Sequence, residues 1–279
     1  MGTDEDEVIK ILGHRSKEQI TKIDHEYRVQ SSGGNSLYHA LKHELSGSFG
    51  DLAISLATPT VELKRMHLQA AVEGLGTRES TLIDVFTQSS NHEIQEIVKD
   101  AQLYQHILSD ISGDFKAAIL GVIKGERPSS DISDDEAAKL AGEFYKAGEG
   151  KIGTDENKYI KILTSHSLAA VKRIDKHYQA KHKHSLEKAI KSETSGDLQD
   201  ILVALTRTPA EYFASRLHRA ISGLGTNERI VNFVFGLLSK HELHEAGKIY
   251  KAKYKESLED AIKGDTSFNY KKLLIELLK

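Results

Sequence analysis

The amino-acid sequence predicts an all-α protein built from four copies of one helical repeat. The 279 residues include only 3 prolines and many Leu, Ala, Lys and Glu residues, a composition typical of helices. Apolar residues recur three and four positions apart, as in Tyr159, Leu163, Leu168, Ile174 and Tyr178, which is amphipathic helix spacing. A Gly-Thr pair also recurs at nearly even intervals, which indicates a repeat architecture.

The Gly-Thr pairs define the repeat. Successive pairs are 74, 77 and 72 residues apart, at Gly2-Thr3, Gly76-Thr77, Gly153-Thr154 and Gly225-Thr226. A glutamate lies two residues after each threonine, at Glu5, Glu79, Glu156 and Glu228. Farther on, each copy has an acidic residue followed by a small polar turn and an apolar helix, at Glu44, Asp110, Glu193 and Asp265.

Two Thr-Pro pairs help to set the repeat boundaries. Thr58-Pro59 and Thr208-Pro209 precede their Gly-Thr pairs by similar distances, and proline after a capping residue is a usual opening of a helix. We expect four units, at 1–56, 57–123, 133–206 and 207–279. The polar stretch 124–132, which contains Pro128, is expected to be the linker between the middle two units.

The bulk composition limits the classes of function. The absence of cysteine excludes disulfides and thiolate metal sites, and it suits a reducing compartment such as the cytosol. The acidic start, Met1–Glu7, is unlike a secretory signal. The longest apolar stretches, such as Ile230–Leu238, are far shorter than the roughly 20 residues that cross a bilayer. A net charge of −3 gives no field that would attract nucleic acid or anionic lipid without an added cation.

The loop Ile221–Thr226 suggests what that cation is. Its glycines allow a tight turn with outward carbonyls, and Thr226 is expected to cap the next helix. Calcium takes six to eight oxygen ligands, including carbonyls and carboxylates. Asp265 follows Gly225 by 40 residues, and Glu193 follows Gly153 by the same distance. A helix cap alone would explain the Gly and Thr residues, but it would not explain an acid at a fixed distance.

These motifs resemble those of the annexin family, and the resemblance covers essentially the whole chain. The nearest matches to the family pattern are Ile221-Ser-Gly-Leu-Gly-Thr226 with Asp265, and Gly148-Glu-Gly-Lys-Ile-Gly-Thr154 with Glu193. The resemblance implies an all-α fold of four repeats with about five helices each, forming a slightly curved disc with calcium loops on its convex face. It also implies calcium-dependent peripheral binding to anionic phospholipid membranes.

The resemblance further implies a ligand set in each repeat. The fourth site would use the carbonyls of Ile221, Gly223 and Gly225 with Asp265; the third would use Gly148, Lys151, Gly153 and Glu193; the second would use Val72, Gly74, Gly76 and Asp110. The second site departs from the pattern, because Asp110 follows Gly76 by only 34 residues and Glu73 replaces a lysine. The first site retains Glu44, but the first repeat is truncated at its start and lacks the loop residues that normally precede Gly2.

The sequence gives less support to other kinds of site. Motifs of EF-hands, dinucleotide sites, P-loops and hydrolases are missing from the sequence, so we expect no enzymatic activity. The four Thr-x-Glu glutamates could form secondary calcium sites, although complementing a helix dipole is the favoured role. His182 and His184 could bind a transition metal, although a solvated loop between helices is favoured.

A calcium-independent helical scaffold for cytoskeletal or other proteins is the alternative from a different class of function, and a lipid hydrolase is a weaker one. We expect a cytoplasmic protein that is monomeric in solution, binds no nucleic acid and could assemble on membranes.

Overall fold

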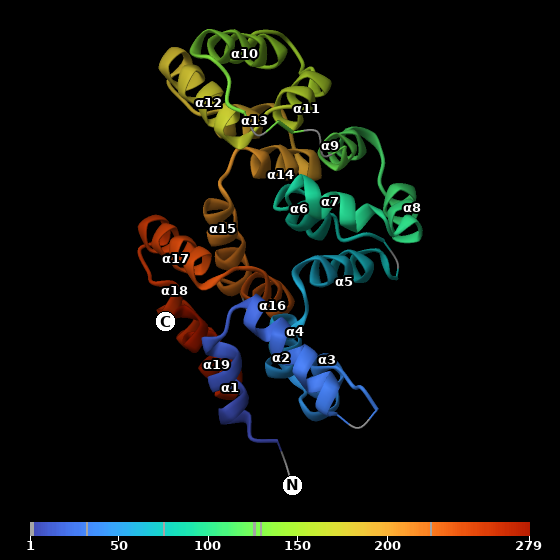
Figure 1. Cartoon of the computed structure of the whole chain (residues 1–279). Helices are drawn as coiled ribbons and strands as arrows, with labels where there is room; N and C mark the ends of the chain where they lie inside the picture. The colour runs from blue at the N-terminus through green and yellow to red at the C-terminus, as the bar shows by residue number, and fades with distance from the viewer. Residues whose placement is uncertain (1–2, 32, 75, 125–126, 129, 224) are drawn as a thin grey trace. The chain divides into compact units, whose positions relative to one another are not determined.

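The computed structural model describes residues 3–31, 33–74, 76–124, 127–128, 130–223 and 225–279. Gly2 of the first motif and residues 125, 126 and 129 of the expected linker lie outside this part of the chain. All regular elements in the described ranges are α-helices, nineteen in number (Figure 1). The prediction of an all-α fold is therefore confirmed.

The helices follow one another in four groups. The first group has four helices: α1 (Glu5–His14), α2 (Lys17–Gln30), α3 (Leu37–Glu44) and α4 (Gly47–Ala57). The second has five: α5 (Thr60–Val72), α6 (Glu79–Thr87), α7 (Asn91–Val98), α8 (Ala101–Asp110) and α9 (Gly113–Ile123). The third has five: α10 (Asp134–Ala147), α11 (Glu156–Thr164), α12 (Leu168–His182), α13 (Leu186–Glu193) and α14 (Gly196–Leu205). The fourth has five: α15 (Pro209–Ile221), α16 (Glu228–Leu237), α17 (Lys240–Tyr254), α18 (Leu258–Asp265) and α19 (Phe268–Leu278).

Local sequence signals fix many of the helix starts. Ser16, Ser90 and Ser239 each form a capping box, in which the serine accepts from the third helical amide and a Gln or Glu side chain accepts from the serine amide. These reciprocal bonds satisfy amides that would otherwise lack partners in the first turn. These serines therefore determine where α2, α7 and α17 begin.

The small polar turn after each distal acid starts the last helix of each group. Helices α4, α9 and α14 begin at Gly47, Gly113 and Gly196, which have φ values of 61°, 59° and 61°. Glycine adopts this left-handed region without the steric cost of a Cβ atom. In the fourth copy Phe268 occupies the same position with φ of 49°. The turn is thus common to all four copies, but its usual residue is not.

The chain forms two compact units, residues 1–63 with 209–279 and residues 64–208. Within the first unit, α4 packs on α16 and α1 packs on α19 (Figure 1). Within the second unit, α9 packs on α11 and α6 packs on α14. Each unit therefore pairs two repeats. Fully buried residues of these pairs include Leu52 and Val231 in the first unit and Leu82 and Ala118 in the second.

No helix in the described ranges is both long and apolar enough to cross a membrane.

Candidate calcium sites

In every repeat, the Gly-Thr loop and the distal acid lie together. The threonine hydroxyl donates a hydrogen bond to the acid carboxylate in all four copies: Thr3 to Glu44 (3.0 Å), Thr77 to Asp110 (2.9 Å), Thr154 to Glu193 (2.8 Å) and Thr226 to Asp265 (2.5 Å). Hydrogen bonds to a charged group are stronger than those between neutral groups. The loop and the acid are therefore joined at four equivalent positions.

The short spacing in the second repeat does not separate Asp110 from its loop. Helix α7 has 8 residues, whereas its counterparts α12 and α17 have 15 each. Because the missing residues come from this helix, the connection is shorter and Asp110 still meets Thr77. Of the two departures from the family pattern, the spacing of 34 residues therefore does not keep the acid from its loop, whereas Glu73 still stands in place of a lysine.

The expectation that Thr226 caps the next helix is wrong. The capping residue of α16 is Asn227, whose side chain accepts from the Ile230 amide. Asp155 caps α11 in the same way. Asn227 is the residue directly before the first residue of α16, Glu228, and the Thr226 hydroxyl instead donates to the distal carboxylate. Sequence reasoning missed this contact, although the threonine in all four copies was a signal of it.

The second and fourth loops share one backbone arrangement. The amide of Arg78 donates to the Ala71 carbonyl at 3.0 Å, and Asn227 donates to the Ala220 carbonyl at 2.7 Å. The predicted ligands Val72 and Ile221 are the last residues of α5 and α15. The remaining predicted carbonyl ligands are glycines with exposed positions: Gly74, Gly76, Gly223 and Gly225. The predicted glycine ligands of these two loops therefore lie at the protein surface.

The third loop, residues 148–155, is two residues longer than the second and fourth loops and is closed by additional hydrogen bonds. The Lys151 amide donates to the Gly148 carbonyl at 3.0 Å, and the Asp155 amide donates to the Ala147 carbonyl at 2.7 Å. A Cβ atom at Gly148 would lie 2.1 Å from the Tyr159 hydroxyl and 3.0 Å from Cγ of Glu193. Only glycine fits there, so the predicted carbonyl ligand and the predicted acid are held next to one another.

The side chain of Glu149 anchors this loop to α12. Its carboxylate accepts from the Tyr178 hydroxyl and lies 3.3 Å from Nε2 of His184. The ring of His182 stacks on Tyr145, with centroids 4.0 Å apart. His182 ends α12 and His184 lies in the turn before α13, so the expected position between helices is confirmed, but both residues are only partly exposed and their rings pack within the third repeat.

The carboxylates of the third and fourth sites have no basic partner within the described residues. Glu44 lies 2.9 Å from Nδ1 of His43, and Asp110 lies 3.9 Å from Nε2 of His106. Glu193 and Asp265 form no such ion pair with a described Lys, Arg or His side chain. Histidine carries a positive charge only when it is protonated, so the first two acids have a histidine neighbour, which the last two lack among the described residues, rather than a permanent counter-charge.

Buried tyrosines lie beside these two carboxylates. Burial raises the pKa of Tyr159, and the nearby charges of Glu193 and Glu149 raise it further. Burial also raises the pKa of Tyr250 to about 12, with contributions from Glu256, Tyr254 and Asp265. Both phenols therefore stay neutral at physiological pH and add no negative charge to the sites.

The first-turn glutamates begin their helices, as expected for residues that complement a helix dipole. They are the first residues of α1, α6, α11 and α16. Glu5 accepts from the Asn269 side chain and Glu228 accepts from the Ser48 hydroxyl, so each contacts the partner repeat of its unit. Burial raises the pKa of Asp197 in the third repeat, and the nearby charge of Glu79 raises it further. The secondary-site alternative stays a prediction.

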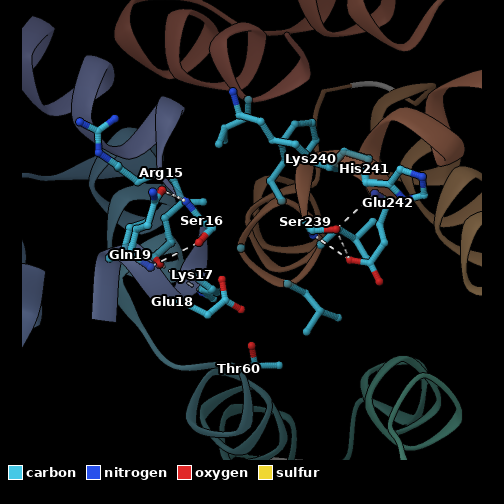
Figure 2. A pocket seen from close by; sticks show the side chains of 18 of the residues that line it. Arg15, Ser16, Lys17, Glu18, Gln19, Thr60, Ser239, Lys240, His241 and Glu242 are labelled. Carbon is cyan, nitrogen blue, oxygen red and sulfur yellow. Dashed lines mark hydrogen bonds between the residues drawn. The ribbon is translucent and has the colours of Figure 1, made fainter. Parts of the chain in front are cut away.

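Elsewhere in the first unit, a cavity of about 570 Å³ lies at the C-terminal ends of α1 and α16. Figure 2 shows Arg15, Lys17, Glu18, Thr60 and Lys240 around it. Burial lowers the pKa of Lys17 to about 7. The candidate calcium loops lie at the N-terminal ends of α1 and α16, so this cavity is separate from them.

In the part of the chain that the structure describes, no cluster of three or more His, Cys, Asp or Glu side chains could hold a metal. The predicted sites rely on backbone carbonyls instead.

Comparison with known proteins agrees with these features. The annexin family model matches residues 1–56, 65–122, 141–205 and 212–277. Annexin A13 of Canis lupus familiaris is 33% identical over 288 residues, covering 100% of this chain and 90% of that protein.

Solved structures match over nearly the same extent. The structure of annexin III matches with a TM-score of 0.92 and 34% identity, covering 100% of this chain and 89% of that chain. The structure of calcium-bound annexin (Sm)1 matches with a TM-score of 0.87 and 25% identity, covering 99% and 85%. The chain therefore belongs to the annexin family, whose members in general bind phospholipid in a calcium-dependent manner and are not enzymes.

Proposed function

We propose that this protein binds anionic phospholipid membranes reversibly, with calcium bridging loop carbonyls and one carboxylate per repeat to lipid head groups. The observation that carries the proposal is the hydrogen bond from the loop threonine to the distal acid, which occurs in all four repeats. This contact joins the carboxylate to the loop threonine, which directly follows a glycine whose carbonyl is a predicted ligand in the second, third and fourth repeats. Calcium prefers such mixed oxygen ligands.

Each bridge needs the lipid to complete it. A loop offers about three carbonyls and one carboxylate, which is fewer than the six to eight oxygens that calcium takes. Phosphate or carboxylate oxygens of a head group, with water, would fill the remaining positions. Calcium affinity without lipid is therefore expected to be weak, toward the millimolar end of the usual range.

The sites are expected to contribute unequally. The third site (Gly148, Lys151, Gly153 and Glu193) and the fourth site (Ile221, Gly223, Gly225 and Asp265) carry acids without an ion pair to a described Lys, Arg or His side chain and should bind most of the calcium. The second site (Val72, Gly74, Gly76 and Asp110) has a histidine near its acid. In the first repeat, Glu44 lies against His43 and is expected to contribute least.

An exposed apolar side chain supports membrane contact at the third loop. Ile152 lies between Lys151 and Gly153 and has a relative exposure of 104%. Apolar side chains are drawn from water toward the acyl boundary of a bilayer. Calcium bound at the adjacent carbonyls would place Ile152 against that boundary.

We further infer a peripheral protein at the cytoplasmic face of membranes, without enzymatic activity and monomeric in solution. The deciding experiment is pelleting of the purified chain with phosphatidylserine vesicles, with and without calcium. We expect pelleting with calcium and release by chelator. Equal pelleting in both conditions would instead favour the calcium-independent scaffold, and turnover of lipid would favour a hydrolase.

A further inference from the structure

The turn between α18 and α19 contains an aromatic residue in an unfavourable backbone conformation. Phe268 has φ of 49°, a region that bulky residues rarely adopt. The three equivalent turns place Gly47, Gly113 and Gly196 there, with φ between 59° and 61°. The fourth repeat thus keeps a backbone shape suited to glycine but carries phenylalanine.

Neighbouring contacts hold this backbone in place. The Asn269 side chain donates to Glu5, and Nζ of Lys272 lies 3.0 Å from a carboxylate oxygen of Asp6. On the other side, the Thr266 amide and hydroxyl both bond the Ile262 carbonyl. Strained residues persist where the surroundings determine their conformation, and they are concentrated at functional sites.

The phenyl ring gains nothing from packing within the described chain. Phe268 has a relative exposure of 88%, and the other large hydrophobic residues exposed in the described ranges are Tyr27, Val29 and Ile152. In three of the four turns the residue two positions later is buried instead, namely Phe49, Phe115 and Tyr270. Phe268 therefore combines backbone strain with an aromatic ring in water, and the fold benefits from neither.

The position of Phe268 next to the fourth candidate calcium site explains this combination. It follows Asp265 by three residues, a span of at most about 10 Å. Thr226 joins the fourth loop to Asp265 through the carboxylate (2.5 Å) and the backbone carbonyl (2.9 Å). A lipid head group bound through calcium at Asp265 would bring its acyl boundary within reach of the ring.

We propose that Phe268 is a membrane anchor of the fourth repeat, entering the apolar boundary of the bilayer when calcium binds at Asp265. This inference rests on the proposed function, because calcium must first bring the site to the membrane. The occupant is lipid rather than protein, since the ring borders a lipid-binding loop and aromatic side chains favour the boundary between head groups and acyl chains. Removing the ring should weaken binding without harming the fold.

Two variants test the anchor. Phe268→Gly restores the residue of the other three turns, so it should raise the thermal midpoint by a few degrees, roughly 2–4 °C. It should also weaken calcium-dependent vesicle binding about tenfold, which corresponds to the lower end of the free-energy range for burying one large apolar side chain. Val29→Ser is the matched control: it removes another exposed apolar side chain, on α2, and should leave vesicle binding unchanged.

Phe268→Trp supplies a direct readout. The chain contains no tryptophan, so this variant has a single indole whose emission should shift to the blue, and be quenched by lipids brominated in the acyl chain, only with both calcium and vesicles. If the wild type pellets with calcium but Phe268→Gly binds equally well and the indole emission does not change, the anchor is wrong and the proposed function stands. If the wild type shows no calcium-dependent pelleting, both are wrong.

Discussion

Oδ2 of Asp265 accepts a hydrogen bond from the hydroxyl of Thr226 at 2.5 Å, although the two residues are 39 positions apart. The same hydroxyl also lies 2.9 Å from the backbone carbonyl of Asp265. Because Oδ2 is held in this way, the rotamer of the carboxylate is fixed. Oδ1 accepts no other hydrogen bond within the described residues, so it is available to a cation beside the loop.

The first prediction concerns the threonine. Thr226→Val preserves size and removes the hydroxyl, so the Asp265 carboxylate should lose its fixed orientation. A hydrogen bond to a charged group contributes about 1.5–3 kcal/mol, so the calcium concentration for half-maximal vesicle binding should rise roughly tenfold. Thr21→Val is the control, because Thr21 bonds only to its own helix. Identical calcium requirements for both variants would show that the contact does not organise the site.

The second prediction ranks the four acids. Glu193→Gln and Asp265→Asn preserve size and remove charge, so each should raise the calcium needed for vesicle binding, and the double variant should be worse than either. Linked sites bind multivalently, so the double loss should be steep. Glu44→Gln should change little, because Glu44 already lies against His43. Normal binding by the double variant, with loss in Glu44→Gln, would reverse the ranking.

The third prediction concerns Gly148. Alanine there would place its Cβ 2.1 Å from the buried Tyr159 hydroxyl, so Gly148→Ala should lower the unfolding free energy by about 1–3 kcal/mol and weaken calcium binding at the third site. Gly142→Ala is the matched control in α10, where an added Cβ meets no atom within 4 Å. It should stabilise the protein by about 0.5–1 kcal/mol. Urea unfolding and calorimetric calcium titration measure both effects, and equal stabilities would contradict the packing argument.

The fourth prediction concerns Ile152. Since the chain has no tryptophan, Ile152→Trp introduces one indole at the exposed tip of the third loop. Its emission should shift to the blue when calcium and phosphatidylserine vesicles are both present, and chelator should reverse the shift. Val29→Trp, at an exposed position on α2, should show no shift. A shift produced by calcium alone would indicate loop closure rather than membrane contact.

The fifth prediction is a pH dependence of stability. Burial alone would raise the pKa of Glu187, but hydrogen bonds from Arg207 and Lys191 outweigh burial and lower the pKa to about 2. Because this value lies below that of an unfolded carboxyl, the stabilisation is present above about pH 4.5 and is lost as pH falls toward 2.

Glu187→Gln should therefore cost about 1–2 kcal/mol at pH 7, discounted for partial exposure, and clearly less at pH 3. Glu245→Gln, which breaks the exposed Lys248 pair, should leave the free energy of unfolding at pH 7 nearly unchanged. Urea unfolding at the two pH values provides the test. If Glu187→Gln lowered the free energy of unfolding equally at pH 7 and pH 3, the lowered pKa of Glu187 would not be a source of stability.

The sequence by itself determined the helical class, the fourfold repeat and the pairing of each Gly-Thr loop with an acid. These features are local or periodic: apolar spacing selects helices, glycine allows tight turns, and a spacing of 40 residues recurs because one unit is repeated. The repeat boundaries at 1–56, 57–123, 133–206 and 207–279, and the ligand sets, remain predictions. The sequence also showed Asp110 at an irregular spacing, but it did not show that a short α7 compensates.

Only the tertiary structure decided which groups meet. Thr226 was expected to cap a helix, because a hydroxyl beside free amides usually does. Asn227 caps α16 instead, and packing of α18 against α17 and α15 brings the Asp265 carboxylate to the Thr226 hydroxyl, which donates a hydrogen bond to it. The turn that carries Phe268 is likewise followed by contacts between α19 and α1, from Asn269 to Glu5 and from Lys272 to Asp6, that no local pattern contains. Side-chain partners are chosen among competing groups, and packing between residues far apart in the chain determines which of them are present.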